Sequence, residues 1–304
     1  MPKKIRIGTR GSDLALWQAH HVQDLLKHLG SETEITVIKT QGDKIDNVPL
    51  SELEGKGFFT KELEDAQLDG RVDMAVHSLK DLSTEMPEGL TLAAMIGRED
   101  PRELLLIRKD GVDPQRMTDR EILPLRDKAV IGTSAARRQA QLRILRPDLQ
   151  IKDLRGNVPT RVNRLREGQY DAILIARAGV RRLELELDDL VSCPLDVEAF
   201  IPAPGQGMLG IQCRDEEPLS DLLGHLNCEE AARAVRAERQ LLKALEAGCQ
   251  LPFGVNVRRE GDHYRMVVFW QDPKSPENRL RFQIDGLDPM ALASEAEKII
   301  TERT

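Results

Sequence analysis

Short apolar runs alternate with amphipathic segments along the first two-thirds of the 304-residue chain, and this pattern constrains the fold more than any other feature. Apolar runs of about four to eight residues indicate strands, and the amphipathic segments between them indicate helices that pack on a sheet. The first such pair is a strand over Lys4–Thr9 and a helix from about Ser12 to Leu29, which Gly30 ends. The alternation predicts an α/β fold.

The same reasoning places the other elements and two breaks between them. Strands are expected over Glu34–Thr40, Val72–His77, Ala129–Gly132, Gln150–Leu154, Ala172–Ala176, Met208–Cys213, His263–Trp270 and Arg279–Ile284. Helices are expected over Phe59–Leu68, Ala135–Leu145, Glu229–Leu245 and Pro289–Thr301. The breaks are the charged, proline-containing segment Arg98–Arg102 and the segment Pro202–Gly207, and the hundred or so residues between them have the size of a domain.

The charge balance excludes several classes of protein. The chain has 44 basic and 51 acidic residues, a net charge of −7, and a nucleic-acid binder needs a basic face instead. No stretch approaches the roughly 18 apolar residues of a membrane-spanning helix. The basic residues near the N-terminus have no apolar region behind them, which argues against a secretory signal. We therefore expect a cytoplasmic protein that binds neither nucleic acid nor membrane.

Four cysteines are present: Cys193, Cys213, Cys228 and Cys249. None forms a CxxC pair and no histidine flanks them at zinc-ligand spacing, so we expect reduced thiols and no metal site. Cys249 differs from the others because Gly248 is typical of a helix end and Pro252 prevents the helix from resuming. This predicts an accessible thiol on a loop, although thiols on loops are often incidental.

Three turns share one pattern, in which a strand ends at a Gly/Ser/Thr turn, an arginine follows and a helix begins. These turns are Ile7–Ser12, Ile131–Arg138 and Leu154–Arg161. Free N–H groups at a helix start favour an anion, glycine permits close approach, and arginine matches a carboxylate with two parallel hydrogen bonds. Ser and Thr at a helix start are often only caps, and such arginines are often solvated. Because arginine there opposes the helix dipole, three repeats are harder to explain as capping alone. They imply a ligand with several negative groups, or one long enough to reach all three turns.

The adjacent pair Lys80-Asp81 follows the strand expected over Val72–His77. Neighbouring lysine and aspartate residues are most often a surface pair. The alternative is an acid/base carboxylate beside a cation that keeps it ionised.

Taken in order along the chain, these fragments resemble the porphobilinogen deaminase family. The resemblance rests on Arg10–Ser12 with Leu14, Ala15 and Gln18, Lys56–Phe59, Ala75–Asp81, Arg98–Arg102, Gly132–Arg138 with Gln139, Leu154–Arg161, Pro204–Gly207 and Gly248–Gln250. A collinear series of this kind is far more specific than any single motif, and it weakens after about residue 255.

The resemblance implies a transferase of haem and tetrapyrrole biosynthesis that condenses four porphobilinogen molecules head to tail, with loss of ammonia, into the linear tetrapyrrole hydroxymethylbilane. It implies a dipyrromethane cofactor joined to Cys249 by a thioether, and a catalytic role for Asp81. The side chains that it implies for binding carboxylates are Arg10, Ser12, Lys80, Thr133, Ser134, Arg137, Arg138, Arg155, Arg161 and Arg182.

The fold that the resemblance implies has two domains like periplasmic binding proteins, the first discontinuous, and a small α+β C-terminal domain that carries the cofactor. The expected domains are residues 1–100 with 201–222, residues 103–198 and residues 225–304. A monomer is expected.

The substrate chemistry agrees with this reading. Each porphobilinogen carries an acetate and a propionate, so the growing chain gains two carboxylates per unit and requires many arginines. Loss of ammonia gives a cationic azafulvene, which one carboxylate, Asp81, can stabilise through the pyrrole N–H groups. Ala135, Ala247 and Leu82-Ser83 depart from the family pattern, and they put fine substrate contacts in doubt rather than the reaction class.

Two rival readings remain at this point. A non-enzymatic pair of domains that clamps an anionic ligand explains the arginine turns, but not Asp81 or the loop residue Cys249. A regulatory effector domain is the other, but no helix-turn-helix segment is apparent.

Overall fold

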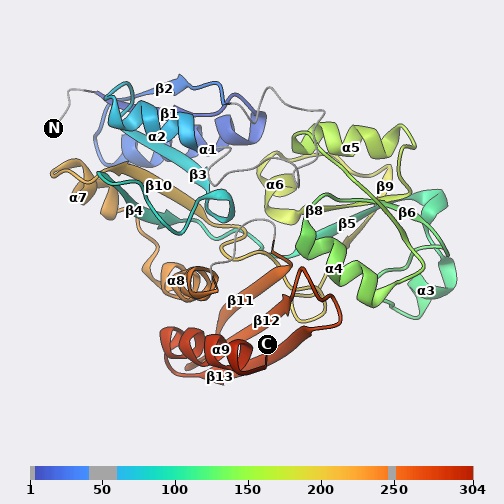
Figure 1. The fold of residues 1–304 in the computed structure, drawn as a ribbon. Coiled ribbons are helices and arrows are strands. Elements are labelled where there is room, and N and C mark those ends of the chain that lie inside the picture. Colours follow the sequence, from blue (N-terminus) through green and yellow to red (C-terminus); the bar gives the residue numbers. More distant parts are fainter. Residues whose placement is uncertain (1–3, 41–59, 246–250, 304) are drawn as a thin grey trace.

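The computed structural model describes residues 4–40, 60–245 and 251–303, and within them the strands form three separate sheets (Figure 1). Two sheets have five strands and belong to α/β units, and the third has three strands. The expected fold class, two α/β units and a small α+β C-terminal unit, is therefore confirmed. None of the helices in this part of the chain has the length and apolar character that a membrane crossing requires.

The first sheet has the strand order β2-β1-β3-β10-β4. Its strands are β1 (Ile5–Thr9), β2 (Thr33–Val37), β3 (Met74–Ser78), β4 (Leu90–Ile96) and β10 (Leu209–Arg214). Its helices are α1 (Asp13–His28), α2 (Lys61–Leu68) and α7 (Leu219–Gly224). β1, β2 and β3 run parallel, whereas β10 runs antiparallel to β3 and β4. The strand β10 follows the strands of the second sheet in the sequence but pairs with β3 and β4 of the first sheet. The first domain is therefore discontinuous, as expected.

The second sheet repeats this plan with the order β7-β6-β8-β5-β9. Its strands are β5 (Glu103–Arg108), β6 (Val130–Gly132), β7 (Gln150–Lys152), β8 (Ala172–Ala176) and β9 (Leu190–Pro194). Its helices are α3 (Pro114–Thr118), α4 (Ala136–Leu145), α5 (Val158–Arg166) and α6 (Arg177–Arg182). β5 is antiparallel to both neighbours and occupies the place that β10 has in the first sheet. The sequence pattern did not indicate β4, β5 or β9.

The C-terminal sheet is an antiparallel meander of β11 (Phe253–Glu260), β12 (His263–Gln271) and β13 (Arg279–Gly286). The helices α8 (Glu229–Ala244) and α9 (Pro289–Arg303) pack against it. Figure 1 shows α8 between this sheet and the first one. The strand β11 was not predicted, because its last three residues are all charged and interrupt the apolar pattern.

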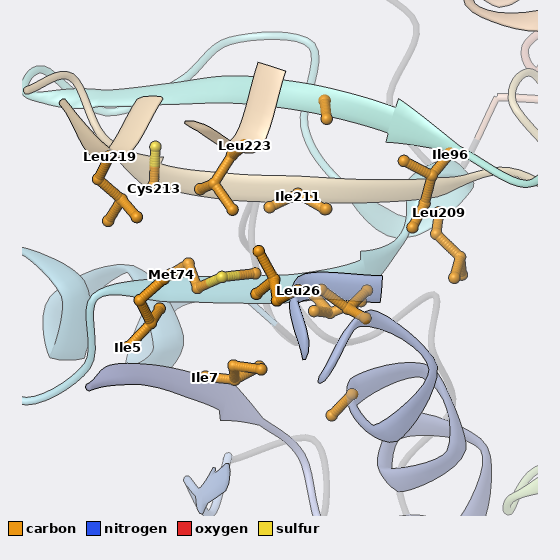
Figure 2. Close-up of a cluster of buried hydrophobic side chains, with 14 residues drawn as sticks. Ile5, Ile7, Leu26, Met74, Ile96, Leu209, Ile211, Cys213, Leu219 and Leu223 are labelled. Atoms are coloured by element: carbon orange, nitrogen blue, oxygen red, sulfur yellow. The ribbon is translucent and has the colours of Figure 1, made fainter. Parts of the chain in front are cut away.

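The largest apolar cluster of the first domain joins its sheet to α1 and α7. Figure 2 shows Ile5, Ile7, Met74 and Ile211 from the strands beside Leu26 of α1 and Leu219 and Leu223 of α7, and every one of these side chains is buried. Each buried large apolar side chain contributes roughly 1.5–3 kcal/mol. This packing fixes the strand register, and with it the edge of the sheet at which the turns after β1 and β3 emerge.

Two segments cross side by side between the first and second sheets. They are residues 97–102 and residues 201–208, and the backbone N–H of Glu99 donates to the carbonyl oxygen of Gly207 at 2.9 Å. Gly207 has φ = +88°, and a side chain there would collide with the Glu99 carbonyl. Glycine is therefore required where the two crossing segments touch.

A buried polar network joins β3 to β10 in the first domain. The Oε1 atom of Gln212 accepts from Nε2 of Gln67 at 2.9 Å and lies 3.1 Å from Nε2 of His77. Burial, with a smaller contribution from Arg10, lowers the pKa of His77 to about 4, although the hydrogen bond to Gln212 opposes this shift. The neutral imidazole is thus the form that the fold stabilises.

This network predicts an acid-sensitive fold. Below pH 6.5 the unfolded chain protonates His77 while the folded chain does not until about pH 4, so the free energy of unfolding falls across that window. The full shift corresponds to about 3 kcal/mol at about 1.4 kcal/mol per pH unit. Urea unfolding between pH 4 and 8 measures this dependence. The free energy of unfolding should fall less steeply toward acid pH for His77→Gln than for the parent. His225→Gln, at an exposed site, is the control and should keep the parental slope. Equal slopes for all three proteins would contradict the prediction.

Candidate active site

The three arginine turns lie where the sequence predicts them, at the carboxyl ends of β1, β6 and β7. They lead into α1, α4 and α5. Lys80 and Asp81 sit in a 3-10 turn, η3 (Leu79–Asp81), directly after β3. The carboxyl ends of strands are where open α/β sheets bind ligands, so four candidate segments emerge at suitable edges.

The starts of the three helices differ in how they are capped. The hydroxyl of Ser12 accepts from the N–H of Ala15 at 3.4 Å, and Asn157 caps α5 through the N–H of Thr160 at 2.9 Å. The helix α4 differs, because its N-cap is Ala135, which makes no side-chain hydrogen bond. A methyl side chain has no acceptor to offer a helix start.

Ser134 and Thr133 bond elsewhere in the second turn. Ser134 Oγ accepts from the N–H of Leu154 at 2.9 Å and donates to the carbonyl oxygen of the same residue at 3.2 Å. Thr133 is buried, and its hydroxyl lies 3.4 Å from the N–H of Ala135. Ser134 therefore joins the second turn to the third, immediately before Arg155.

Glu103 holds two arginines of α4 at the start of β5. Nη2 of Arg137 donates to one carboxylate oxygen at 2.6 Å, and Nη2 of Arg138 donates to the other at 2.7 Å. Each guanidinium also donates through Nη1 to a backbone carbonyl, that of Ile201 for Arg137 and that of Leu174 for Arg138. Glu103 is fully buried and the arginines are almost so, which makes this a buried ion triad.

Lys80 of the first domain interacts electrostatically with the triad. Burial alone would raise the pKa of Glu103, but Arg138, Arg137 and Lys80 together lower it to about 2. Burial lowers the pKa of Lys80, with Asp81 and Glu103 opposing and the two arginines reinforcing. Nζ of Lys80 donates to Oε1 of Gln206 at 3.2 Å. The turn after β3 therefore lies against the triad of the second domain.

Arg161 connects this cluster to the third turn. Its Nε donates to the carbonyl oxygen of Gly156 at 2.7 Å. Burial is the main cause that lowers the pKa of Arg161 to about 10; Arg138 and Arg155 act in the same direction, and Asp81 opposes the shift. Asp81 itself is exposed. The structure thus brings Lys80, Asp81 and the arginines of the second and third turns into one site between the two sheets.

Two further predicted residues interact with the first domain. Arg10 acts on the pKa of His77 in the first domain. Nη2 of Arg182 donates to the carbonyl oxygens of Gly97 at 3.1 Å and Gly207 at 2.6 Å, and its guanidinium lies 5.7 Å from the ring centroid of Trp17. Arg182 therefore contacts both crossing segments and a helix of the first domain.

Cys249 lies outside the described residues, between the end of α8 at Ala244 and the start of β11 at Phe253. The other cysteines are free thiols, and burial raises the pKa of Cys213 to about 11. The described ranges contain no group of His, Cys, Asp and Glu side chains that would hold a metal ion.

Two family models match the chain. "Porphobilinogen deaminase, dipyromethane cofactor binding domain" matches residues 5–220, and "Porphobilinogen deaminase, C-terminal domain" matches residues 232–295. The chain belongs to the porphobilinogen deaminase family. Membership supports an enzyme of tetrapyrrole biosynthesis and does not favour the non-enzymatic binding module.

Relatives within this family cover most of the chain. Porphobilinogen deaminase of Geobacter metallireducens is 47% identical over 88% of this chain and 81% of its own length. The protein of the same name from Maridesulfovibrio salexigens is 44% identical over 95% of this chain and 88% of its own. Among solved structures, the periplasmic VFT2 domain of Bordetella pertussis BvgS aligns at 13% identity and a TM-score of 0.44, covering 74% of this chain and 86% of that one.

Sequence reasoning missed three charged residues that bond in this region: Glu103, and Glu238 and Arg239 of α8, which bond to the crossing segments and to the turn that carries Asp81. Glu103 is a charged residue at the head of a Leu-Leu-Leu-Ile run, and a charge at the start of so apolar a strand was a usable signal. Glu238 is three residues after Val235 and three before Leu241, and so falls on the apolar face of α8. The sequence carries no comparable signal for Arg239.

The ion triad predicts a strong stability defect when its carboxylate is removed. Glu103→Gln leaves two buried guanidinium groups without an anion, and breaking a buried ion pair in this way costs about 3–5 kcal/mol. Urea unfolding should show a marked loss for Glu103→Gln. Asp189→Asn, which breaks the exposed pair with Arg166, is the matched control and should change little. Losses of similar size in the two variants would argue against the triad.

Proposed function

We propose that this deaminase condenses four molecules of porphobilinogen head to tail, releasing ammonia at each step, into the linear tetrapyrrole hydroxymethylbilane. The observation that carries the proposal is the cluster in which Lys80 and Arg161 lie near the exposed carboxylate of Asp81 while Arg138 lies near both of these cations. A transferase of this kind requires both parts: cations that bind the many carboxylates of the growing tetrapyrrole, and one carboxylate at the reacting centre.

The residues of the site fit a dipyrromethane cofactor, whose two rings carry acetate and propionate groups. Among the described residues, the cations Lys80, Arg137, Arg138 and Arg161 interact with the carboxylates Asp81 and Glu103, in a protein whose net charge is −7. Nε of Arg138 is buried and has no hydrogen-bond partner among the described residues. A ligand carboxylate would supply that partner and balance the excess positive charge.

We propose that Cys249 carries the cofactor through a thioether. The cofactor-binding family model covers residues 5–220, whereas Cys249 falls within the range of the C-terminal model. This division agrees with a group that is attached to the third domain and held by the first two. When bound, the cofactor supplies the pyrrole ring to which the first substrate is joined.

Asp81 is the proposed catalytic residue. Departure of ammonia from porphobilinogen leaves a positive charge conjugated with the pyrrole nitrogen, and a carboxylate that accepts from the pyrrole N–H stabilises that charge. The same carboxylate takes and returns protons at the ring. Lys80, which donates to Gln206 beside the triad, binds a ligand carboxylate rather than acting as a base.

We extend the carboxylate-binding role to the remaining residues of the family pattern, and we propose a cytoplasmic monomer. These residues are Arg10, Ser12, Thr133, Ser134, Arg137 and Arg182. The domain limits that we propose are residues 1–100 with 201–222, residues 103–198 and residues 225–304. The crossing segments at residues 97–102 and 201–208 support these limits, because neither contains a helix or strand.

The catalytic role of Asp81 predicts a loss of turnover without a loss of fold. Asp81→Asn keeps the shape of the side chain and removes its negative charge, so steady-state turnover of porphobilinogen should fall by a factor on the order of 10² or more. Circular dichroism and the intact mass of the purified protein should match the parent. Near-normal product formation would reject this role for Asp81.

Covalent attachment predicts a mass above that of the bare chain. Intact-mass spectrometry of the purified, active protein should show the chain plus one dipyrromethane, and Cys249→Ser should show the chain alone and no turnover. An active protein with the bare chain mass would refute the thioether.

A further inference from the structure

Arg239 of α8 donates to three backbone carbonyls around the turn that carries Lys80 and Asp81. Its Nη1 donates to the carbonyl oxygens of Leu79 at 3.3 Å and Leu82 at 3.0 Å, and its Nη2 donates to that of Ser83 at 2.7 Å. These carbonyls lie immediately before and after the Lys80-Asp81 pair. One guanidinium from the third domain therefore spans the whole turn.

This guanidinium lies in an unusual environment. Burial lowers the pKa of Arg239 to about 10, and no carboxylate pairs with it in the part of the chain that the structure describes. Other arginines of α8 form exposed ion pairs, Arg236 with Glu229 and Arg233 with Asp288. Desolvating a cation is costly, and at Arg239 the three carbonyl dipoles offset that cost.

Attachment of α8 to the first domain does not depend on Arg239. Ala232 and Val235 pack in an apolar cluster with Leu79, Leu82, Met95 and Met208. The neighbouring Glu238 is fully buried and ties α8 to the first crossing segment through Arg98 at 2.7 Å and to the second through the N–H of Gly205 at 2.7 Å. The hydrogen bonds of Arg239 therefore act on the turn itself.

We propose that Arg239 is a positioning residue for Asp81: it fixes the backbone of residues 79–83 so that the Asp81 carboxylate keeps its place while the product lengthens. The proposal rests on the catalytic role proposed for Asp81. It also connects that carboxylate to α8, on which Arg239 lies ten residues before Cys249 in the sequence.

The test compares Arg239→Met, Arg239→Lys and the control Arg236→Met as purified holoenzymes. Loss of positioning by about 1 Å lowers a rate by a factor on the order of 10², so Arg239→Met should lower kcat by roughly this factor and leave KM within about twofold. The intact mass should still include the cofactor. Arg239→Lys keeps the positive charge and should recover part of kcat. The recovery should be incomplete, because an ammonium group reaches fewer carbonyls than a guanidinium fork. Arg236→Met should retain parental kcat.

A double-mutant cycle with Asp81→Glu separates positioning from a general structural role. If Arg239 acts through Asp81, Arg239→Met should lower kcat much less in the Asp81→Glu background than in the parent. Additive losses, a parental kcat in Arg239→Met, or folded Arg239→Met without cofactor would each overturn the proposal. If Arg239→Met does not fold, Arg239→Lys enters the cycle in its place. High turnover in Asp81→Asn would reject the proposed catalytic residue itself, whereas an inactive Asp81→Asn with additive Arg239 effects rejects only the positioning role.

Discussion

The carboxylate of Glu103 is the contact on which the site between the two sheets depends. It stands at the first residue of β5, directly after the first crossing segment, and it pairs with both Arg137 and Arg138. Arg137 also donates to the carbonyl oxygen of Ile201 at the start of the second crossing segment. A single buried anion therefore joins the start of the second domain, the first turn of α4 and the return path of the chain. Without it, two desolvated guanidinium groups would repel each other where the chain crosses twice.

The same anion shapes the charge of the site. It occupies one Nη donor of each arginine and leaves Nε of Arg138 buried and unpaired, while Lys80 and Arg161 contribute further positive charge. An acidic protein thus presents a compact cationic site, and Asp81 lies among these cations as the exposed carboxylate. Such an arrangement attracts carboxylate-bearing substrates locally while the rest of the surface does not.

The third domain is an integral part of this site. On α8, Glu238 bonds to both crossing segments and Arg239 bonds to the turn of Asp81. The α8 helix is therefore held both by the two crossing segments and by the turn that carries Lys80 and Asp81. These contacts place the C-terminal unit beside the site between the first two sheets.

The sequence by itself determined the local features of this protein: most helices and strands, the three arginine turns, the Lys80-Asp81 pair and the collinear motifs of the family. Each of these depends on residues within about one helix or strand of one another, where periodicity and turn chemistry are decisive. Only the tertiary structure decided which charges meet. Glu103 and Arg137 are 34 residues apart, Arg98 and Glu238 are 140 apart, and Arg239 is 160 from Leu79. No local pattern encodes such pairings, because they follow from how the sheets and α8 pack, and packing sets both the distance between two charges and the water that remains between them.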